Sequence, residues 1–193
     1  MFRITTLLLC LLPLTLAGCP SPQNNPEKTG DNPPITPAEH PQLSGAEKAA
    51  VADIERLVGS HLSVGTDGEP DLIIDQAGHV IVVDLSGVED PQKVNDAVLE
   101  YVGKLTHTQK LFLSSTAVTD SGLAHLAGLS ELTHLDLSST AVTNAGLRHL
   151  KSLKNLRTVY CLNTQINTAG SNDLKKALPK VLVTHGGDGP AIP

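Results

Sequence analysis

The seven residues LSSTAVT occur twice in this chain, at Leu113–Thr119 and again at Leu137–Thr143. The same spacing extends on both sides of these letters and into a third, looser copy. A further copy begins at Val83-Asp-Leu-Ser-Gly-Val88, where the spacing to Leu111 is slightly longer. The period is the spacing from Leu113 to Leu137. A fixed period of this length is typical of a solenoid, in which each copy forms one coil. The matching positions are Leu111, Leu135 and Val159; Thr116, Thr140 and Thr164; Gly122, Gly146 and Gly170; and Leu126, Leu150 and Leu174.

Each unit begins with a Leu-x-Leu pattern, which predicts a short strand. Side chains alternate along a strand, so Leu111 and Leu113 are expected to face the core while Phe112 faces outward. Successive copies then stack as parallel strands about 4.8 Å apart. Two hydrogen-bonding roles follow for the threonines. We expect Thr116, Thr140 and Thr164 to link adjacent coils, and Thr119 and Thr143 to be helix N-caps.

The Thr-Asp/Asn-x-Gly-Leu segments resemble the bacterial T-D-x-G-L type of the leucine-rich repeat family over residues 80–184. This resemblance implies an α/β fold, a short solenoid with parallel strands on one face and short helices on the other. Thr116 and its equivalents stand where the family usually has Asn. The first copy lacks the Gly-Leu pair, and Ser171 stands where Leu123 and Leu147 do. Such departures are expected in the terminal coils of a solenoid.

Two caps are expected to flank the repeats. The Ser44-x-x-Glu47 spacing is that of a capping box, in which each side chain satisfies an amide of the first helical turn. Gly59 is placed to end this helix, and residues 72–85 predict a β-hairpin. The helix and hairpin form the predicted N-terminal cap, residues 44–79. The predicted C-terminal cap covers 175–183, and a flexible tail covers residues 185–193.

The N-terminal segment, residues 1–19, predicts export and lipid attachment. The apolar run of residues 4–16 is shorter than the about 20 residues that cross a bilayer as a helix, and it fits a signal peptide. Leu16-Ala17-Gly18-Cys19 resembles the lipobox of bacterial lipoproteins. The resemblance implies a signal peptide over residues 1–18, cleavage between Gly18 and Cys19, and lipidation of Cys19, palmitate included. The alternative is an ordinary signal peptide with an incidental cysteine.

Residues 19–43 are predicted to be a disordered tether. Seven prolines lie among mostly polar residues from Pro20 to Leu43, a composition that does not form a core. Together with the lipid anchor, this tether predicts a membrane-anchored lipoprotein of the cell envelope, on its periplasmic or cell-surface side. We expect the protein to be monomeric.

Charge and cysteine content exclude several classes of function. The chain has 14 basic and 20 acidic residues, a net charge of −6, which disfavours nucleic acid because binding it needs a basic surface. Cys10 belongs to the predicted signal peptide, and Cys161 is expected to be a small buried apolar residue. Nothing in the sequence predicts a cofactor or a metal.

The outward strand positions are the candidate binding surface. Outside the predicted signal peptide the chain has three aromatic residues, and two of them, Phe112 and Tyr160, are expected on this face. An aromatic and apolar stripe with scattered charge is typical of protein-binding surfaces. We therefore expect a protein or peptide partner to bind there. The candidate partner-binding residues are Asp84, Lys110, Phe112, His134, Asp136 and Tyr160.

Alternative functions are weaker but remain open. The prediction is no enzyme, because His134, Asp136 and Ser138 are spaced about 7 Å apart along a strand, too far for a nucleophile–base contact. His134 with Asp136 does not make up a zinc site. His125 and His149 are expected on helix surfaces of adjacent coils, where a two-histidine pair is a formal possibility. The alternative to protein binding is a structural or accessory lipoprotein with no discrete ligand.

Overall fold

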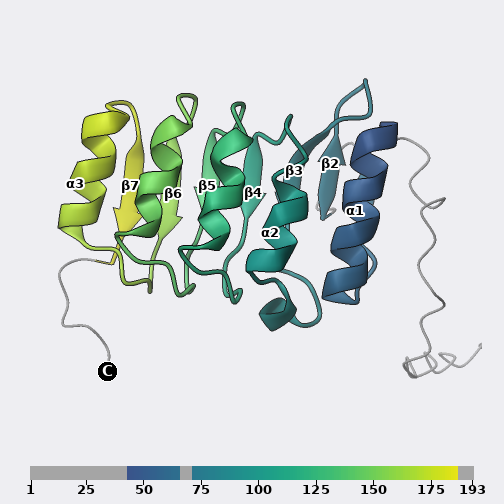
Figure 1. Cartoon of the computed structure of the whole chain (residues 1–193), viewed down its shortest axis with the longest axis horizontal. Helices are drawn as coiled ribbons and strands as arrows, with labels where there is room; N and C mark the ends of the chain where they lie inside the picture. Colours follow the sequence, from purple (N-terminus) through teal and green to yellow (C-terminus); the bar gives the residue numbers. More distant parts are fainter. Residues whose placement is uncertain (1–42, 66–70, 187–193) are drawn as a thin grey trace, which may run out of the picture. The chain divides into compact units, whose positions relative to one another are not determined.

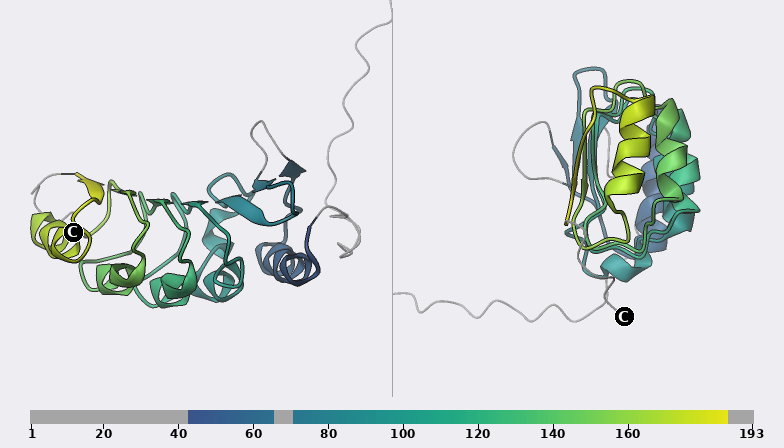
Figure 2. Two further views of the ribbon diagram at one scale, coloured as in Figure 1. Left: turned by 90° about the horizontal axis from the view of Figure 1, so that it is seen from above. Right: turned by 90° about the vertical axis from the view of Figure 1, so that its left-hand side faces the viewer.

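The computed structural model describes residues 43–65 and 71–186. Their strands form one sheet in the order β1-β2-β3-β4-β5-β6-β7, and the longer helices lie along one of its faces (Figures 1 and 2). No helix in these residues is both long and apolar enough to cross a membrane. The strands are β1 (Val64–Gly65), β2 (Leu72–Ile74), β3 (Val80–Asp84), β4 (Lys110–Phe112), β5 (His134–Asp136), β6 (Thr158–Cys161) and β7 (Leu182–His185). The helices are α1 (Gly45–Val58), α2 (Asp96–Val102) and α3 (Thr168–Ala177), with 3₁₀ helices η2 (Pro91–Lys93), η3 (Gly122–Gly128) and η4 (Gly146–Ser152).

Strands β3 to β7 pair in parallel, and their register follows the sequence period. Leu111 pairs with Leu135 and Leu135 with Val159, each one period further along the chain. Val159 then pairs with Val183, so the segment predicted as a C-terminal cap supplies a further strand in phase with the repeat. The first copy is longer than the others, since Val83 pairs with Leu111. The fold is the α/β leucine-rich repeat solenoid that the repeat predicts.

The hydrophobic core lies between the sheet and the helices. Leu111, Leu135 and Val159 are completely buried, as alternation along the strands requires. Leu123 and Leu126 of η3 are also completely buried and close the core from the helix side. A single cluster of buried apolar side chains extends from Leu43 to Val183, so each coil covers the leucines of the next.

The N-terminal helix begins and ends where the sequence predicts, but the capping-box prediction is wrong. Ser44 is the N-cap without a side-chain cap bond, and Gly59 ends the helix with φ 73°. The Ser44 hydroxyl donates to Glu47 Oε2 (2.6 Å) rather than accepting from a helix amide. The other Glu47 oxygen, Oε1, accepts from the Val80 amide (3.0 Å). The buried Glu47 carboxylate therefore joins α1 to the hairpin.

The hairpin is confirmed, with two differences at the ends of the sheet. Strands β2 and β3 are antiparallel, and Gly78 in the turn has φ 82°. The short strand β1, parallel to β2, is not anticipated by the sequence pattern. At the other end, His185 was expected to start the flexible tail but is the last residue of β7. Residues 187–193 lie outside the described residues.

Candidate functional site

Adjacent coils are joined by hydrogen bonds from the repeated threonine to the aspartate of the preceding coil. Asp120 accepts from the Thr143 amide at Oδ1 (2.8 Å) and from the Thr143 hydroxyl at Oδ2 (2.6 Å). Asp96 makes the same pair of bonds to Thr119, at 2.8 and 2.6 Å. We call these two contacts the Asp–Thr joints. Through them, the aspartate of one coil accepts hydrogen bonds from the backbone and the side chain of the next coil.

The glycine of the motif makes room for these joints. A methyl group at Gly146 would lie against the Asp120 carboxylate, and one at Gly122 would lie against that of Asp96. In the motif Thr-Asp-x-Gly, the Thr donates to the aspartate of the preceding coil and the Asp accepts from the threonine of the next coil. The Gly has no side chain and so leaves room for the aspartate of the preceding coil. The repeat pattern alone does not predict this contact, although Gly122 and Gly146 repeat with the period and so do Asp96 and Asp120.

Both expectations for the threonine side chains are wrong in detail. Thr116 and Thr140 donate to carbonyl groups of their own coil, those of Leu113 and Leu137, both at 2.6 Å. They close a local turn and do not link coils. Thr143 is not an N-cap either, because η4 has Ala145 at that position. Its hydroxyl accepts from the Ala145 amide (3.1 Å) while donating to Asp120.

The outward strand residues form two rows across the sheet, on the face away from the helices (Figure 2). All six candidate partner-binding residues belong to these rows. Row one is Asp84, Phe112, Asp136, Tyr160 and Thr184, and row two is Val82, Lys110, His134, Thr158 and Leu182. We call the two rows together the strand face. The register therefore places Asp136 directly between Phe112 and Tyr160.

Exposure is uneven along the strand face. Tyr160 is 40% exposed and Lys110 is exposed, whereas Phe112 and His134 are half-buried. His134 Nδ1 lies 2.8 Å from the Thr133 hydroxyl, an adjacent residue outside the rows. The face thus offers an aromatic ring and a flexible cation to solvent, with a second ring partly sheltered.

The two aspartates of the strand face are positioned by the turns that follow their strands. Asp84 Oδ1 accepts from the Ser86 amide (2.9 Å) and hydroxyl (2.6 Å). Asp136 Oδ1 accepts from the Ser138 amide (2.8 Å). In the described residues the second oxygen of each carboxylate has no hydrogen bond. These bonds hold each carboxylate at the strand end. They do not connect His134, Asp136 and Ser138 into a catalytic relay.

Cys161 is a core residue, as expected. It replaces the inward leucine of the other coils, is almost completely buried, and its thiol donates to the Thr184 carbonyl (3.2 Å). Burial, together with the negative charge of Asp136, raises the pKa of the thiol to about 11. A thiol with such a pKa stays protonated and unreactive at neutral pH.

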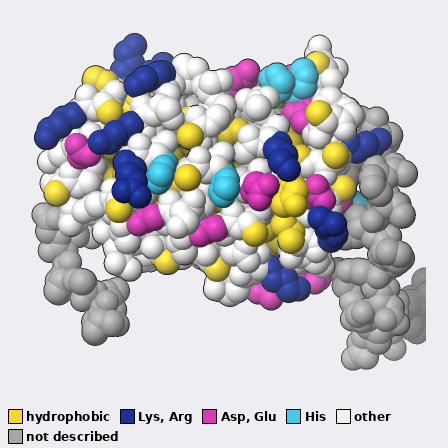
Figure 3. All heavy atoms as spheres, viewed as in Figure 1, with side chains coloured by type: hydrophobic (Ala, Val, Ile, Leu, Met, Phe, Trp, Pro, Cys, Tyr) yellow, Lys and Arg dark blue, Asp and Glu magenta, His cyan; other side chains and the backbone are white. Residues whose placement is uncertain are grey.

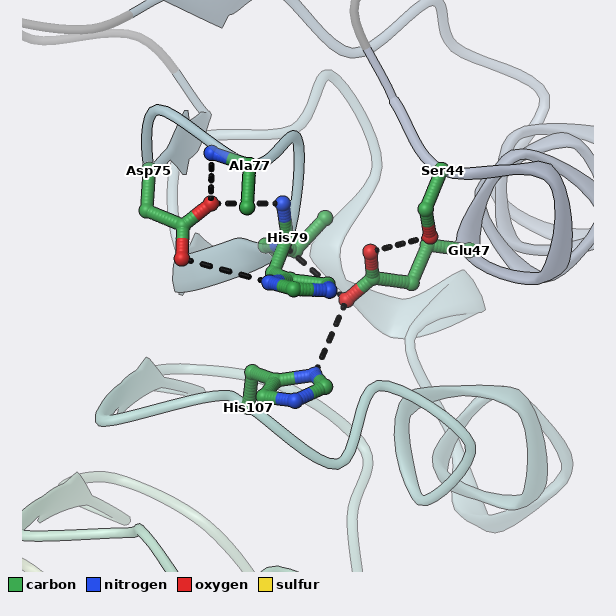
Figure 4. A network of polar contacts seen from close by, with 7 residues as sticks. Ser44, Glu47, Asp75, Ala77, His79 and His107 are labelled. Atoms are coloured by element: carbon green, nitrogen blue, oxygen red, sulfur yellow. Dashed lines mark hydrogen bonds and ion pairs between the residues drawn. The ribbon is translucent and has the colours of Figure 1, made fainter.

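A second polar cluster lies where the N-terminal helix meets the hairpin (Figure 4). The His79 and His107 rings stack with centroids 3.9 Å apart, and His107 Nδ1 is 3.8 Å from Glu47 Oε1. Asp75 Oδ2 lies 3.2 Å from His79 Nδ1. The His79 amide, then its side chain and the Ala77 amide, lower the pKa of Asp75. In the described ranges no three His, Cys, Asp or Glu side chains are grouped to hold a metal ion. The contacts of Glu47 with Val80 and His107, and the stacking of His79 on His107, join α1, the hairpin and the segment after α2.

Gly18 and Cys19, the predicted cleavage and lipidation residues, lie outside the described residues. His125 and His149 lie on η3 and η4, with His125 exposed and His149 half-buried. The Arg148 guanidinium donates to His149 Nε2 (3.3 Å). The helix-surface expectation for both histidines is therefore confirmed.

Comparison with known proteins finds likeness in structure alone. No protein-family model and no curated protein matches the chain. It is similar to an internalin from Listeria monocytogenes, with 15% identity over 62% of this chain and 47% of that one and a TM-score of 0.35. A leucine-rich repeat protein of Leptospira interrogans shows 20% identity over 44% of this chain and 27% of that one, with a TM-score of 0.33.

A third similar structure is the leucine-rich repeat ectodomain of the receptor kinase SOBIR1 from Arabidopsis thaliana. It shows 14% identity over 75% of this chain and 93% of that chain, with a TM-score of 0.35. The chain spans about half the length of the internalin and about a quarter of the Leptospira protein. The assignment of the fold rests on the register and burial described above.

Proposed function

We propose that this protein binds a protein or peptide partner through the strand face. The observation that carries the proposal is the continuous row in which Phe112 and Tyr160 flank the carboxylate of Asp136. Partly exposed aromatic side chains supply much of the free energy of protein association, and neighbouring charges give specificity. Lys110 and His134 in the second row, and Asp84 at the start of the first, extend the surface.

We propose further that the protein is a lipid-anchored component of the cell envelope. The support is the sequence Leu16-Ala17-Gly18-Cys19 after a short apolar segment, with a proline-rich stretch behind it. Lipidation of Cys19 would place the strand face at a membrane surface within reach of the tether. Replacement Cys19→Ser should move the protein from the membrane to the aqueous fraction, and unchanged fractionation contradicts the anchor.

The passive alternative also has support in the contacts. Asp84 and Asp136 each bond to the turn that follows, so their carboxylates have a role in the fold without any ligand. A purely structural lipoprotein needs nothing more from its strand face.

Photocrosslinking in the cell separates the two functions. A photoreactive amino acid is introduced at His134, on the strand face, and in a matched variant at Ala124, an exposed residue of η3 on the helix side. A binding strand face gives a discrete crosslinked product from position 134 that is absent from position 124. No product from 134, or the same products from both positions, contradicts the proposal.

A further inference from the structure

Acidic and basic side chains are unevenly distributed along residues 44–186, with an acidic excess in the first part and a basic excess in the second. Residues 44–144 carry five basic and fifteen acidic side chains, a net charge of −10. Residues 145–186 carry seven basic side chains and one acidic side chain, a net charge of +6. The net charge of the whole chain, −6, does not reveal this division. We call the seven basic residues of the second segment the basic end: Arg148, Lys151, Lys154, Arg157, Lys175, Lys176 and Lys180.

The side chains of the basic end gather on one part of the surface (Figure 3), and most of them make no ion pair in the described residues. Figure 3 shows Lys and Arg side chains gathered over α3 and the adjoining coil. The single acid of this segment, Asp173, pairs with Lys151 (2.6 Å). Within residues 43–65 and 71–186, Arg157, Lys175, Lys176 and Lys180 make no ion pair. Their charges are therefore available to a partner.

The basic end borders the last strand of the sheet. In the described residues β7 pairs with β6 alone, so its other edge has no strand partner. The Leu182 amide donates to the Arg157 carbonyl (2.7 Å) on the β6 side. Because amide directions alternate along a strand, the amides of Val183 and His185 point to the open side. Natural proteins usually protect such an edge with Lys, Glu or Pro, and Leu182–His185 contains none of them.

The core is also less well covered at this end. Val181 is 5% exposed and Val183 is 6% exposed, whereas Leu111 and Leu135 are completely buried. Leu182 is 59% exposed, more than the other exposed large apolar residues, Leu57, Tyr160 and Leu162. An added strand would cover the open edge and part of this apolar surface. A membrane or a nucleic acid would not supply the backbone hydrogen bonds that a strand edge requires.

We propose that an extended, acidic segment of another protein adds to β7 as an eighth strand, held by the basic end. Main-chain hydrogen bonds to Val183 and His185 give the affinity, and alternating side chains of the segment contact Leu182. Acidic residues at one end of the segment contact Lys180 and Arg157. Acidic residues at its other end contact Lys175 and Lys176 of α3. This surface includes none of the six candidate partner-binding residues, although Leu182 belongs to the strand face. Protection at the β7 edge or at Phe112 therefore distinguishes this proposal from the proposed function.

The test uses residues 33–193, which contain the whole hydrophobic cluster of the described residues, from Leu43 to Val183. The probe is a blocked peptide that alternates Glu and Val over about ten residues. One control peptide has Lys in place of Glu. A second keeps Glu and Val but is N-methylated at alternate amides, which removes the donors of one peptide edge. The proposal predicts binding of the probe, weakening of that binding with salt, and at least about tenfold weaker binding of both controls.

Two charge variants locate the site. Lys175→Glu, Lys176→Glu and Lys180→Glu together should weaken probe binding at least about tenfold. The matched variant, Arg56→Glu, Lys93→Glu and Lys104→Glu, has the same change in charge at exposed residues of α1 and the first coil and should change binding less than about twofold. Equal effects of the two variants contradict the proposal.

Amide hydrogen exchange identifies the edge directly. Probe binding should slow exchange at Val183 and His185 and leave Phe112 unchanged. Protection at Phe112 instead of β7, or no binding at about 1 mM peptide, overturns the proposal. Binding of phosphatidylglycerol vesicles through the same three lysines, without peptide binding, overturns it in favour of a membrane surface.

Discussion

The residues that stay constant between the two central coils and those that change lie in different surroundings. In LSSTAVT, Leu113 and Leu137 are completely buried, and the final threonines bond to the preceding coil. The residue just before each copy differs, Phe112 in one and Asp136 in the other, and points away from the core. The constant residues therefore specify how coils stack, while the outward positions are free to carry recognition.

The joints between coils provide a second comparison. Asp96 and Asp120 each accept two hydrogen bonds from a threonine of the next coil. At the last joint, Asn144 accepts from the Asn167 amide (3.1 Å) and donates to the Asn167 side chain (2.9 Å). Bonds to a charged acceptor are stronger than neutral ones, so the central joints should be the stronger ones.

The largest effect is expected from a glycine of the motif. Gly146→Ala forces the Asp120 carboxylate away from Thr143 and should lower the free energy of unfolding by about 3 kcal/mol. The matched change Gly128→Ala, where a methyl group meets nothing within 4 Å, should cost less than about 0.5 kcal/mol. Urea unfolding measures both, and similar losses would contradict the role given to Gly146.

Cys161 should react with alkylating agents far more slowly than an exposed cysteine. Burial raises its pKa from 9.0 to about 11, so at pH 9 the thiolate fraction falls about 50-fold. The stability gained from the neutral thiol is present below pH 9 and is lost as the pH rises toward 11. Iodoacetamide labelling in native buffer and in urea measures this difference, and rapid native labelling contradicts the burial.

Deleting the carboxylate of an Asp–Thr joint should lower the free energy of unfolding less than placing a methyl group against it. Asp120→Ala leaves two donors of Thr143 without their acceptor and should lower the free energy of unfolding by about 2 kcal/mol. Asn144→Ala should cost about 1 kcal/mol, because its bonds are neutral. The order of the two unfolding midpoints is the readout. An equal or reversed order contradicts the difference between the joints.

The smallest effect concerns Ser171, which replaces an inward leucine in the last coil. It is buried, and its hydroxyl has no hydrogen-bond partner in the described residues. Ser171→Ala removes that unpaired group and should raise the free energy of unfolding by about 1 kcal/mol. Thermal unfolding checks the sign, and a clear loss of stability contradicts this interpretation.

The sequence predicts burial and register well because both follow from spacing alone. The position of Leu111, one repeat period before Leu135, determines which strand it pairs with and which way it points. The partners of polar groups depend on which atoms the neighbouring coil brings close. For that reason the spacing predicts that Glu47 bonds to a helix amide, whereas it bonds to Val80. It likewise predicts that Thr143 caps its own helix, whereas Thr143 also bonds to Asp120.

The candidate binding surfaces show the same limit. Alternation along the strands was enough to place all six strand-face candidates in two rows, although their role stays a prediction. The basic end was missed because the net charge of the chain is acidic, and a mean does not report where charges gather. A count over residues 145–186 alone would have shown it.

The most direct test of the division between scaffold and recognition is Tyr160→Ala combined with the crosslinker at His134. Tyr160 is partly exposed and makes none of the joints between coils, so the free energy of unfolding should change by less than about 1 kcal/mol. The yield of the crosslinked partner should fall at least about fivefold, because an exposed aromatic residue of the interface is lost. An unchanged yield in a stably folded variant would contradict the account.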